Sequence, residues 1–230
     1  MTRRPFAALV GGLSLVFAGG AFAAGVPANI AAAVSNAARP EAQRAADVSR
    51  KPAEILAFAG VQPGDRVSDF MMGGGYFSRI LSGAVGPTGK VYAYQASEFV
   101  AFQASYAAGQ DETVKFASNI VPVRESLGTV TFPEPLDLIL TAQNYTDLHL
   151  GMATPEQIAA INRQVFDALK PGGVLLVIDH YATDGTGDRD SNTLHRIDIA
   201  MVKAELAAAG FVLDAESDIL RNPADPRTAS

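Results

Sequence analysis

The chain of 230 residues contains no cysteine and no tryptophan, and only three histidines. Without cysteine it has no disulfides, no zinc sites built on thiolates and no cysteine nucleophile. It also lacks any block of Lys and Arg, and its formal net charge is -6. Because binding to the phosphates of nucleic acid needs clustered positive charge, we expect no nucleic acid partner.

The first residues have the pattern of an export signal. Arg3 and Arg4 precede an uncharged, mainly apolar stretch over residues 6–18, and Ala21-Phe22-Ala23 has the small-x-small form of a cleavage site. We therefore expect a signal peptide over residues 1–23 and an exported, periplasmic protein. The twin arginine also resembles the signal of a pathway that exports folded proteins. The alternative is an uncleaved anchor, but many Gly and Ala residues make this stretch a poor membrane span.

The remaining chain has the composition of one globular domain with a sizeable core, since 48% of all residues are hydrophobic and 18% are charged. Residues 24–60 predict an N-terminal helical cap and residues 61–230 an alternating α/β domain. The expected strands are Arg66–Met71, Val91–Tyr94, Ile120–Val123, Leu136–Thr141, Val174–Asp179 and Phe211–Ala215. The expected helices are 27–36, 40–48, 51–59, Tyr76–Val85, Glu98–Ala108, Pro155–Leu169 and Thr193–Ala209.

Short apolar strands that alternate with helices predict a doubly wound, mainly parallel sheet of the Rossmann type, covered on both faces. Ligands bind such sheets beyond the carboxyl ends of the strands. At the first of these ends, residues 67–76 read VSDFMMGGGY and lead into a helix. Glycines let the backbone turn sharply and let a ligand approach the main chain, while the helix offers free N–H groups. The turn therefore predicts a nucleotide-type site.

Four segments together resemble the class I S-adenosylmethionine-dependent methyltransferases. They are VSDFMMGGGYFSRIL, GKVYAYQ, PLDLILTAQ and LKPGGVLLVIDH, in the order and spacing of that family. The resemblance covers residues 50–220. More narrowly, RKPAEILAFAGVQPGD, GGGYFSR, NYTDLH and LHRID are similar to a group of exported bacterial methyltransferases predicted from sequence. The resemblance implies the methyltransferase type of Rossmann-like sheet and S-adenosylmethionine as the cofactor.

The chain departs from the family pattern at several places. In the turn, Asp69 matches the family's acid and Gly73 and Gly75 match its second and third glycines, but Met71 stands at the first glycine. Gln95 stands where the family places the acid that binds the ribose hydroxyls. The family also closes its sheet with a final antiparallel strand. Residues 218–230 are polar, so we expect that strand to be missing and the sixth strand to form an open edge.

The resemblance implies a set of cofactor-binding residues at the strand ends. Gly74 belongs to the turn, Glu98 can reach back toward the ribose, and Glu125 follows the third strand, where the family contacts adenine. Gln143 and Asn144 follow the fourth strand, near the reactive end of the cofactor. The predicted cofactor-binding residues are Asp69, Gly73, Gly74, Gly75, Gln95, Glu98, Glu125 and Gln143, and Asn144 is a predicted catalytic residue.

All three histidines follow strands on the predicted ligand face: His149, His180 and His195. We predict that His180 or His149 acts as a general base. A second hypothesis is that histidines and nearby acids bind a divalent metal, for which imidazole and carboxylate are suitable ligands. Each histidine could also be satisfied by a loop carbonyl or a helix end.

We therefore expect methyl transfer to a small molecule by in-line displacement, which depends mainly on positioning. Two alternatives remain open at this point. One is a non-catalytic exported binding protein that kept the fold, and the other is a metal-assisted enzyme that uses the histidines.

Overall fold

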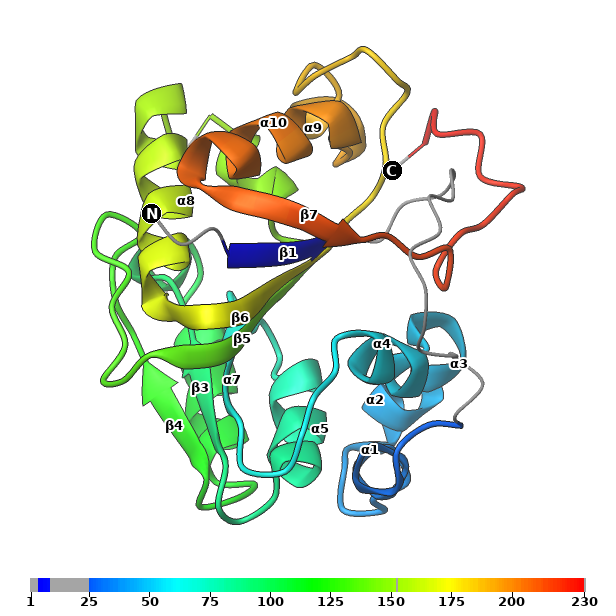
Figure 1. Cartoon of the computed structure of the whole chain (residues 1–230), viewed down its shortest axis with the longest axis vertical. Helices are drawn as coiled ribbons and strands as arrows, with labels where there is room; N and C mark the ends of the chain where they lie inside the picture. The colour runs from blue at the N-terminus through cyan, green and yellow to red at the C-terminus, as the bar shows by residue number, and fades with distance from the viewer. Residues whose placement is uncertain (1–3, 9–24, 152, 230) are drawn as a thin grey trace.

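The computed structural model describes residues 4–8, 25–151 and 153–229. Its centre is one seven-stranded sheet with the order β4-β3-β2-β5-β6-β1-β7 (Figure 1). Every strand pair among the described residues is parallel. The strands are β1 (Arg4–Ala8), β2 (Arg66–Phe70), β3 (Lys90–Tyr94), β4 (Ile120–Val123), β5 (Leu136–Ala142), β6 (Leu169–Ile178) and β7 (Phe211–Ala215). The predicted Rossmann-like architecture is confirmed.

The helices lie on both faces of this sheet (Figure 1). They are α1 (Ala28–Val34), α2 (Glu41–Ala45), α3 (Asp47–Arg50), α4 (Pro52–Phe58), α5 (Tyr76–Val85), α6 (Ser97–Phe102), α7 (Ser105–Val114), α8 (Pro155–Ala168), α9 (Ser191–Leu194) and α10 (Ile199–Ala209), with a short 3-10 helix η1 (Thr146–His149). No helix within the described ranges has the length and apolarity that a membrane crossing requires.

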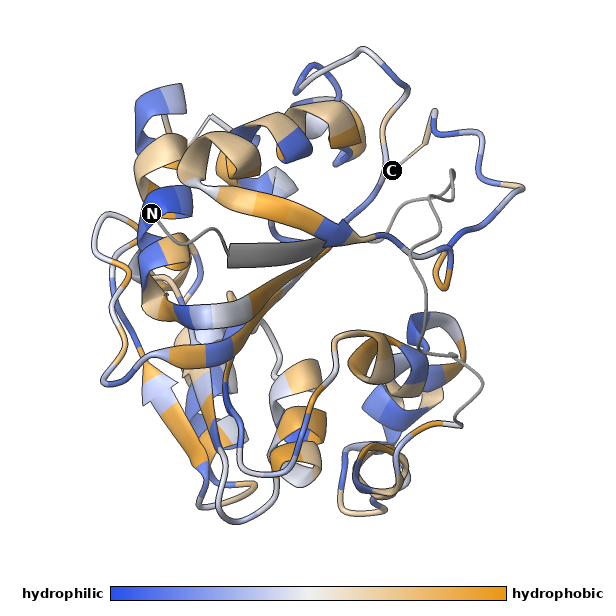
Figure 2. Cartoon of the chain, viewed as in Figure 1, coloured by the Kyte–Doolittle hydropathy of each residue, from blue (hydrophilic) through white to orange (hydrophobic). Residues whose placement is uncertain are grey.

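The central strands bury both faces because their side chains alternate between two apolar clusters. On β3, Tyr92 and Tyr94 pack into a cluster with α8 and α10, whereas Val91 and Ala93 pack into a second cluster with α1, α4 and α5. Figure 2 shows β7 as mainly hydrophobic and α8 as mixed. A sheet that is covered in this way leaves only its strand ends open for a ligand.

Some predicted boundaries were wrong for local reasons. Residues 170–173, which the sequence prediction left between the helix Pro155–Leu169 and the strand Val174–Asp179, are part of β6, where the pairing with β5 jumps from Leu169 to Val174. A Cβ on Gly173 would lie 2.9 Å from the carbonyl oxygen of Leu136, so glycine is needed at this irregularity. The predicted helix Glu98–Ala108 is two helices, α6 and α7.

The N-terminal strand β1 occupies a place that the sequence did not predict. It lies inside the predicted leader 1–23, most of which is outside the described residues, and it pairs in parallel with both β6 and β7. Among the described residues no antiparallel strand closes the sheet. As predicted, β7 (the sixth strand of the sequence interpretation) stands at the edge.

If residues 1–23 are removed, β6 and β7 lose the strand between them. We expect faster backbone hydrogen exchange over Phe211–Ala215 in a chain that begins at Ala24 than in the full chain, because its amides then lack a partner. The pair of β3 and β4 at the other edge is the internal control. Equal exchange over Phe211–Ala215 in both chains would show that β1 does not protect β7.

Candidate active site

A cavity of about 900 Å³ lies beyond the carboxyl ends of β2 and β5, between the glycine-rich turn and the N-terminal helices. This volume lies in the range of small-molecule sites. Its polar lining residues are Gln43, Arg50, Asp69, Gln143, Asn144, Asp147 and His195, and its aromatic ones are Tyr76, Phe77, Phe99, Phe102 and Tyr106. The predicted ligand face of the sheet therefore carries a cavity of suitable size.

The three glycines of the turn have different roles. A Cβ on Gly73 or Gly74 would meet nothing within 4 Å, and both residues line the cavity. Gly75 has φ +71°, and a Cβ there would overlap the side chain of Thr113 on α7. Gly75 is thus required by packing and backbone conformation. Gly73 and Gly74 leave the turn open to the cavity.

Three carbonyl groups of this turn accept hydrogen bonds from side chains of neighbouring segments. Asn144 donates its Nδ2–H to the oxygen of Met71 over 2.9 Å. Arg79, which is buried in α5, donates to the oxygens of Gly74 and Gly75, and Gln43 also donates to Gly74. Within the described residues, the N–H groups of Gly73 and Gly74 donate to no protein acceptor. The carbonyls of Met71, Gly74 and Gly75 are thus engaged by protein donors, whereas the N–H groups of Gly73 and Gly74 have no protein acceptor among the described residues.

Three cavity residues other than glycine adopt left-handed backbone conformations. They are Met71 (φ 59°), Gln143 (φ 65°) and His195 (φ 54°). Such a conformation costs about 1–2 kcal/mol for a residue with a Cβ. Strained backbone of this kind gathers at functional sites, because surrounding structure must hold it in place. Met71 thus keeps the left-handed conformation at the first glycine position of the family pattern, while its side chain packs in the core.

Asp69 at the end of β2 anchors the helix that follows the turn. Its Oδ2 accepts from the N–H and from the hydroxyl of Ser78, at 2.8 and 2.6 Å. Burial raises the pKa of this carboxyl to about 7, outweighing the two Ser78 hydrogen bonds and the charge of Arg50, which lower it. The carboxyl also borders the cavity, so it faces a ligand as well as the helix.

The N-terminal cap is joined to the turn through Tyr76. The hydroxyl of Tyr76 donates to Asp47, which also forms a two-point ion pair with the buried Arg39. The guanidinium groups of Arg39 and Arg50 lie over the Tyr76 ring, 5.4 and 4.7 Å from its centroid. The N-terminal cap therefore forms one side of the cavity.

Arg50 is a site residue that the sequence interpretation did not single out. It lines the cavity and donates to Oε1 of Gln143 over 3.0 Å, while Nε2 of Gln143 lies 2.8 Å from Nε2 of His180. Because Gln143 accepts from Arg50, its amide nitrogen faces His180 as the donor. Arg50 is the first residue of the segment RKPAEILAFAGVQPGD, on which the narrower family resemblance rests. That resemblance did not show that a residue of the cap contacts the end of β5.

The predicted ribose and adenine residues lie outside the cavity lining. The carboxylate of Glu98 accepts from the hydroxyl of Ser126 and from the N–H of Leu127, and its pKa is lowered by these bonds in spite of burial. Glu125 contributes its backbone oxygen to Tyr94 and Ser97. Gln95 is buried, and its Oε1 has no hydrogen-bond partner within the described chain.

The three histidines are not brought together. His149 is buried, with Nε2 3.2 Å from Glu205, and it does not line the cavity. His180 borders a second cavity. His195 lines the first cavity, and its Nε2 lies 2.8 Å from Oδ1 of Asp147. Among the described residues no three His or acidic side chains form a group that could hold a metal ion. The metal-assisted alternative thus gains no geometric support.

His195 lies at a break between α9 and α10 that was not predicted from the sequence. The predicted helix Thr193–Ala209 was wrong, since α9 ends at Leu194 and α10 begins at Ile199. Asp198 caps α10 by accepting from the N–H of Ala200 and also accepts from the N–H of Gly185. A polar residue that satisfies helix N–H groups favours a helix start. The resulting turn carries His195 to the cavity.

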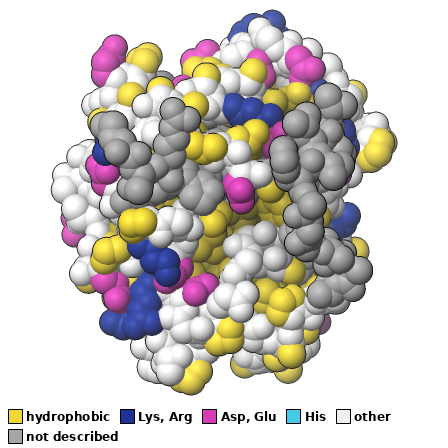
Figure 3. Space-filling view, viewed as in Figure 1, with side chains coloured by type: hydrophobic (Ala, Val, Ile, Leu, Met, Phe, Trp, Pro, Cys, Tyr) yellow, Lys and Arg dark blue, Asp and Glu magenta, His cyan; other side chains and the backbone are white. Residues whose placement is uncertain are grey.

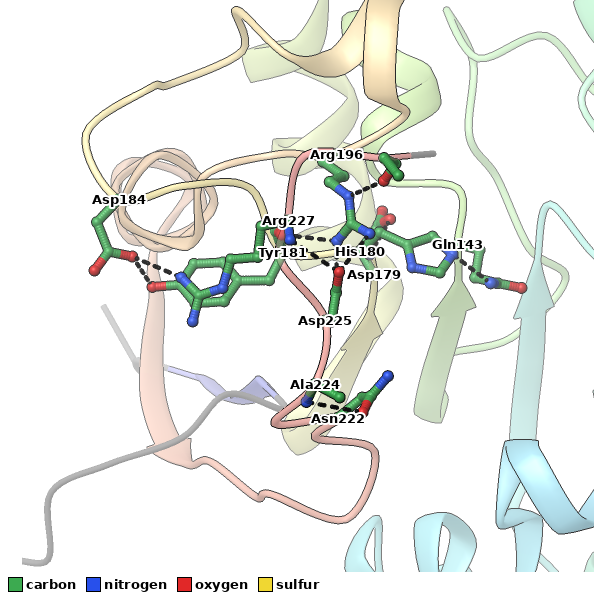
Figure 4. A network of polar contacts seen from close by, with 11 residues as sticks. Gln143, Asp179, His180, Tyr181, Asp184, Arg196, Asn222, Ala224, Asp225 and Arg227 are labelled. Atoms are coloured by element: carbon green, nitrogen blue, oxygen red, sulfur yellow. Dashed lines mark hydrogen bonds and ion pairs between the residues drawn. The ribbon is translucent and has the colours of Figure 1, made fainter.

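The second cavity, of about 660 Å³, lies where the C-terminal segment crosses the end of β6 (Figure 4). Arg196 points into this segment and forms a two-point ion pair with Asp225, and it also donates to the backbone oxygens of Tyr181 and Ala229. Arg227 lies over the Tyr181 ring. The guanidinium group of Arg196 thus donates to protein acceptors, so Arg196 does not offer a free cationic group to a ligand in this cavity.

Similar folds occur among solved structures. A S-adenosylmethionine-dependent methyltransferase from Aquifex aeolicus is 22% identical, with a TM-score of 0.54, over 72% of this chain and 82% of that chain. The [4+2]-cyclase SpnF is also 22% identical, with a TM-score of 0.54, over 76% of this chain and 60% of its own. The chain has the methyltransferase fold. Since one of these proteins is a cyclase, the fold alone does not fix the reaction.

No protein-family model and no curated protein matches the chain. The activity must therefore be argued from the site itself.

The different roles of the glycines can be tested by stability. We expect Gly75→Ala to lower the free energy of unfolding by about 2 kcal/mol or more, because the added methyl group overlaps Thr113 at a left-handed position. Gly74→Ala, in open space, should change it by no more than about 0.5 kcal/mol. Urea unfolding of both variants checks this. Equal losses would contradict the assignment.

The pKa of Asp69 predicts a pH effect on stability. The folded protein keeps this proton up to about pH 7, whereas the unfolded chain loses it near 3.8. The stability that protonated Asp69 contributes is therefore fully present below pH 3.8, and it is lost as the pH rises toward about 7. We expect the free energy of unfolding of the unaltered chain to fall relative to Asp69→Asn between these values. Asp167→Asn, at an exposed ion pair, is the control. Parallel curves for Asp69→Asn and the unaltered chain would contradict this.

Proposed function

We propose that the chain binds S-adenosylmethionine in the first cavity and transfers its methyl group to a small molecule. The observation that supports this most is the turn over Met71–Gly75, where the carbonyls of Met71, Gly74 and Gly75 accept from protein side chains while the N–H groups of Gly73 and Gly74 have no protein acceptor among the described residues. Such a surface suits an anionic or acceptor-rich ligand. The two groups that flank the turn, Arg50 and Asp69, have opposite charges once Asp69 is ionised, which its pKa of about 7 places at neutral pH and above.

These residues fit the methionine part of the cofactor. Arg50 would hold the carboxylate, and Asp69 would hold the ammonium group. Gln95, which follows β3, keeps an unpaired Oε1, but this atom is buried and lies outside the cavity lining, so we assign it no ribose contact. When bound, the cofactor supplies a methyl group activated by a sulfonium.

The protein's own part in this reaction is to position the two reactants. Asn144 holds the Met71 carbonyl, and Arg50 and Gln143 join the cap to the end of β5. Part of the cavity lining is apolar and aromatic, which suits an apolar substrate. Holding two reactants in line can supply much of the acceleration of a displacement.

We also propose that the chain acts after export, in the periplasm, as the pattern of residues 1–23 suggests. The mixed signs of charge on the face in Figure 3 are compatible with the small-molecule substrate proposed here. Folding around the cofactor before twin-arginine export would supply a periplasmic protein with a molecule that is made in the cytoplasm.

Titration calorimetry with S-adenosylmethionine and with S-adenosylhomocysteine tests the proposal. We expect micromolar binding of both, weakened about tenfold or more in Arg50→Gln, since a charge-assisted hydrogen bond is worth about 1.5–3 kcal/mol. Arg163→Gln, which removes an exposed arginine on α8, should bind like the unaltered chain. Failure of the folded, unaltered chain to bind either molecule would overturn the proposal.

A further inference from the structure

One acid and one histidine meet inside the first cavity. Asp147 in η1 and His195 after α9 both line it, and the Nε2 atom of His195 lies 2.8 Å from Oδ1 of Asp147. The side chain of Asp147 is only 10% exposed, whereas that of His195 is 45% exposed. The carboxylate is thus buried behind the imidazole, and the imidazole faces the open side.

The surroundings fix this pair in place. His195 occupies a left-handed turn between α9 and α10, and its N–H donates to the oxygen of Ser191. Asp147 follows Thr146, whose N–H donates to Asp179 at the end of β6. Asp179 and His195 are the charged groups that act most on Asp147. Burial raises the pKa of Asp147 to about 6, with His195 opposing and Asp179 adding to the rise, so it is ionised at neutral pH.

The contact between Asp147 and His195 is one of charge, since Oδ1 of Asp147 has no hydrogen-bond partner among the described residues. An ionised carboxylate beside one ring nitrogen still favours the proton on that nitrogen. Asp147 attracts the proton to Nε2 of His195, so Nδ1 is left with its lone pair. Within the described residues Nδ1 has no protein partner. This is the arrangement in which an acid orients a histidine that serves as a general base. His149 is instead occupied by Glu205, and His180 by Gln143.

We infer that His195, oriented by Asp147, removes the proton from the methyl acceptor and that this acceptor is a phenol. The inference rests on the proposed methyl transfer. The hydroxyl oxygen forms the new bond to the methyl carbon, the carbon–sulfur bond breaks with its electron pair going to sulfur, and the hydroxyl proton moves to Nδ1 of His195. The products are the methyl ether, S-adenosylhomocysteine and a protonated imidazole.

The choice of a phenol follows from the base and from the lining. A carboxylate acceptor is already ionised at neutral pH and needs no base. A phenol, with a pKa near that of tyrosine (about 10), is much closer to imidazole (about 6.5) than an aliphatic alcohol is, so proton transfer is easier. Phe99, Phe102 and Tyr106 line the same cavity and offer apolar surface to aromatic rings.

The test uses 4-nitrophenol, whose phenolate is coloured, added to the full chain with and without S-adenosylhomocysteine. At a pH where the free probe is protonated, we expect the bound probe to show phenolate absorbance in the unaltered chain. His195→Gln should remove this signal, and Asp147→Asn should weaken it, because an amide favours the wrong tautomer. Asp167→Asn, exposed on α8, is the matched control for Asp147→Asn.

A second readout separates this inference from the proposed function. Single-turnover methylation of 4-nitrophenol should fall about a hundredfold or more in His195→Gln, while calorimetry shows unchanged binding of S-adenosylhomocysteine. If the unaltered chain does not bind S-adenosylhomocysteine, that result contradicts the proposed cofactor and not the role of His195. A probe that does not bind, or stays protonated, or ionises equally in His195→Gln, would overturn the role of His195.

Discussion

The site depends on how the backbone between β2 and α5 is held. Asp69 fixes the start of α5 through Ser78, and Arg79 reaches back from the same helix to the carbonyls of Gly74 and Gly75. Together with the bond from Asn144 to Met71, these bonds engage the carbonyls of Met71, Gly74 and Gly75 and leave the N–H groups of Gly73 and Gly74 without a protein acceptor among the described residues. Unpaired N–H groups of this kind suit an anion.

The second half of the site comes from the residues before the sheet. The cap touches the turn at Tyr76 and Gly74, and it places Arg50 over the cavity opposite Asp69. Because the two charged groups come from separate parts of the chain, the charge pattern of the cavity exists only when the cap is docked. The strained conformations of Met71, Gln143 and His195 lie around the same space, so the surrounding packing also holds the backbone there.

Much of this fold could be predicted from sequence, and the reasons are physical. Strands β2 to β6 are short apolar runs with turn residues between them, and Asp69 and the glycines mark the one strand end with a nucleotide-type turn. The roles of Gly73, Gly74 and Gly75 could not be separated, because only the position of Thr113 on α7 shows which of them packs.

The positions of other site residues depend on tertiary contacts that leave no local pattern. Arg50 is one polar residue in a helical cap, and its contact with Gln143 spans distant parts of the chain. His195 looks like part of a continuous helix until Asp198 is seen to cap a new one. Glu98 looks free in the sequence but is occupied by the loop after β4. The parallel pairing of β1 also could not be predicted from a local pattern, since its segment has the composition of a leader.

The turn over Met71–Gly75 and the two flanking charged groups together form the proposed cofactor site. A crystal structure of the full chain with S-adenosylhomocysteine tests this arrangement. We expect the ligand's carboxylate against Arg50, its amino group against Asp69, and its main contacts with the N–H groups of Gly73 and Gly74. A ligand bound in the second cavity, or one that leaves those N–H groups without contact, would contradict it.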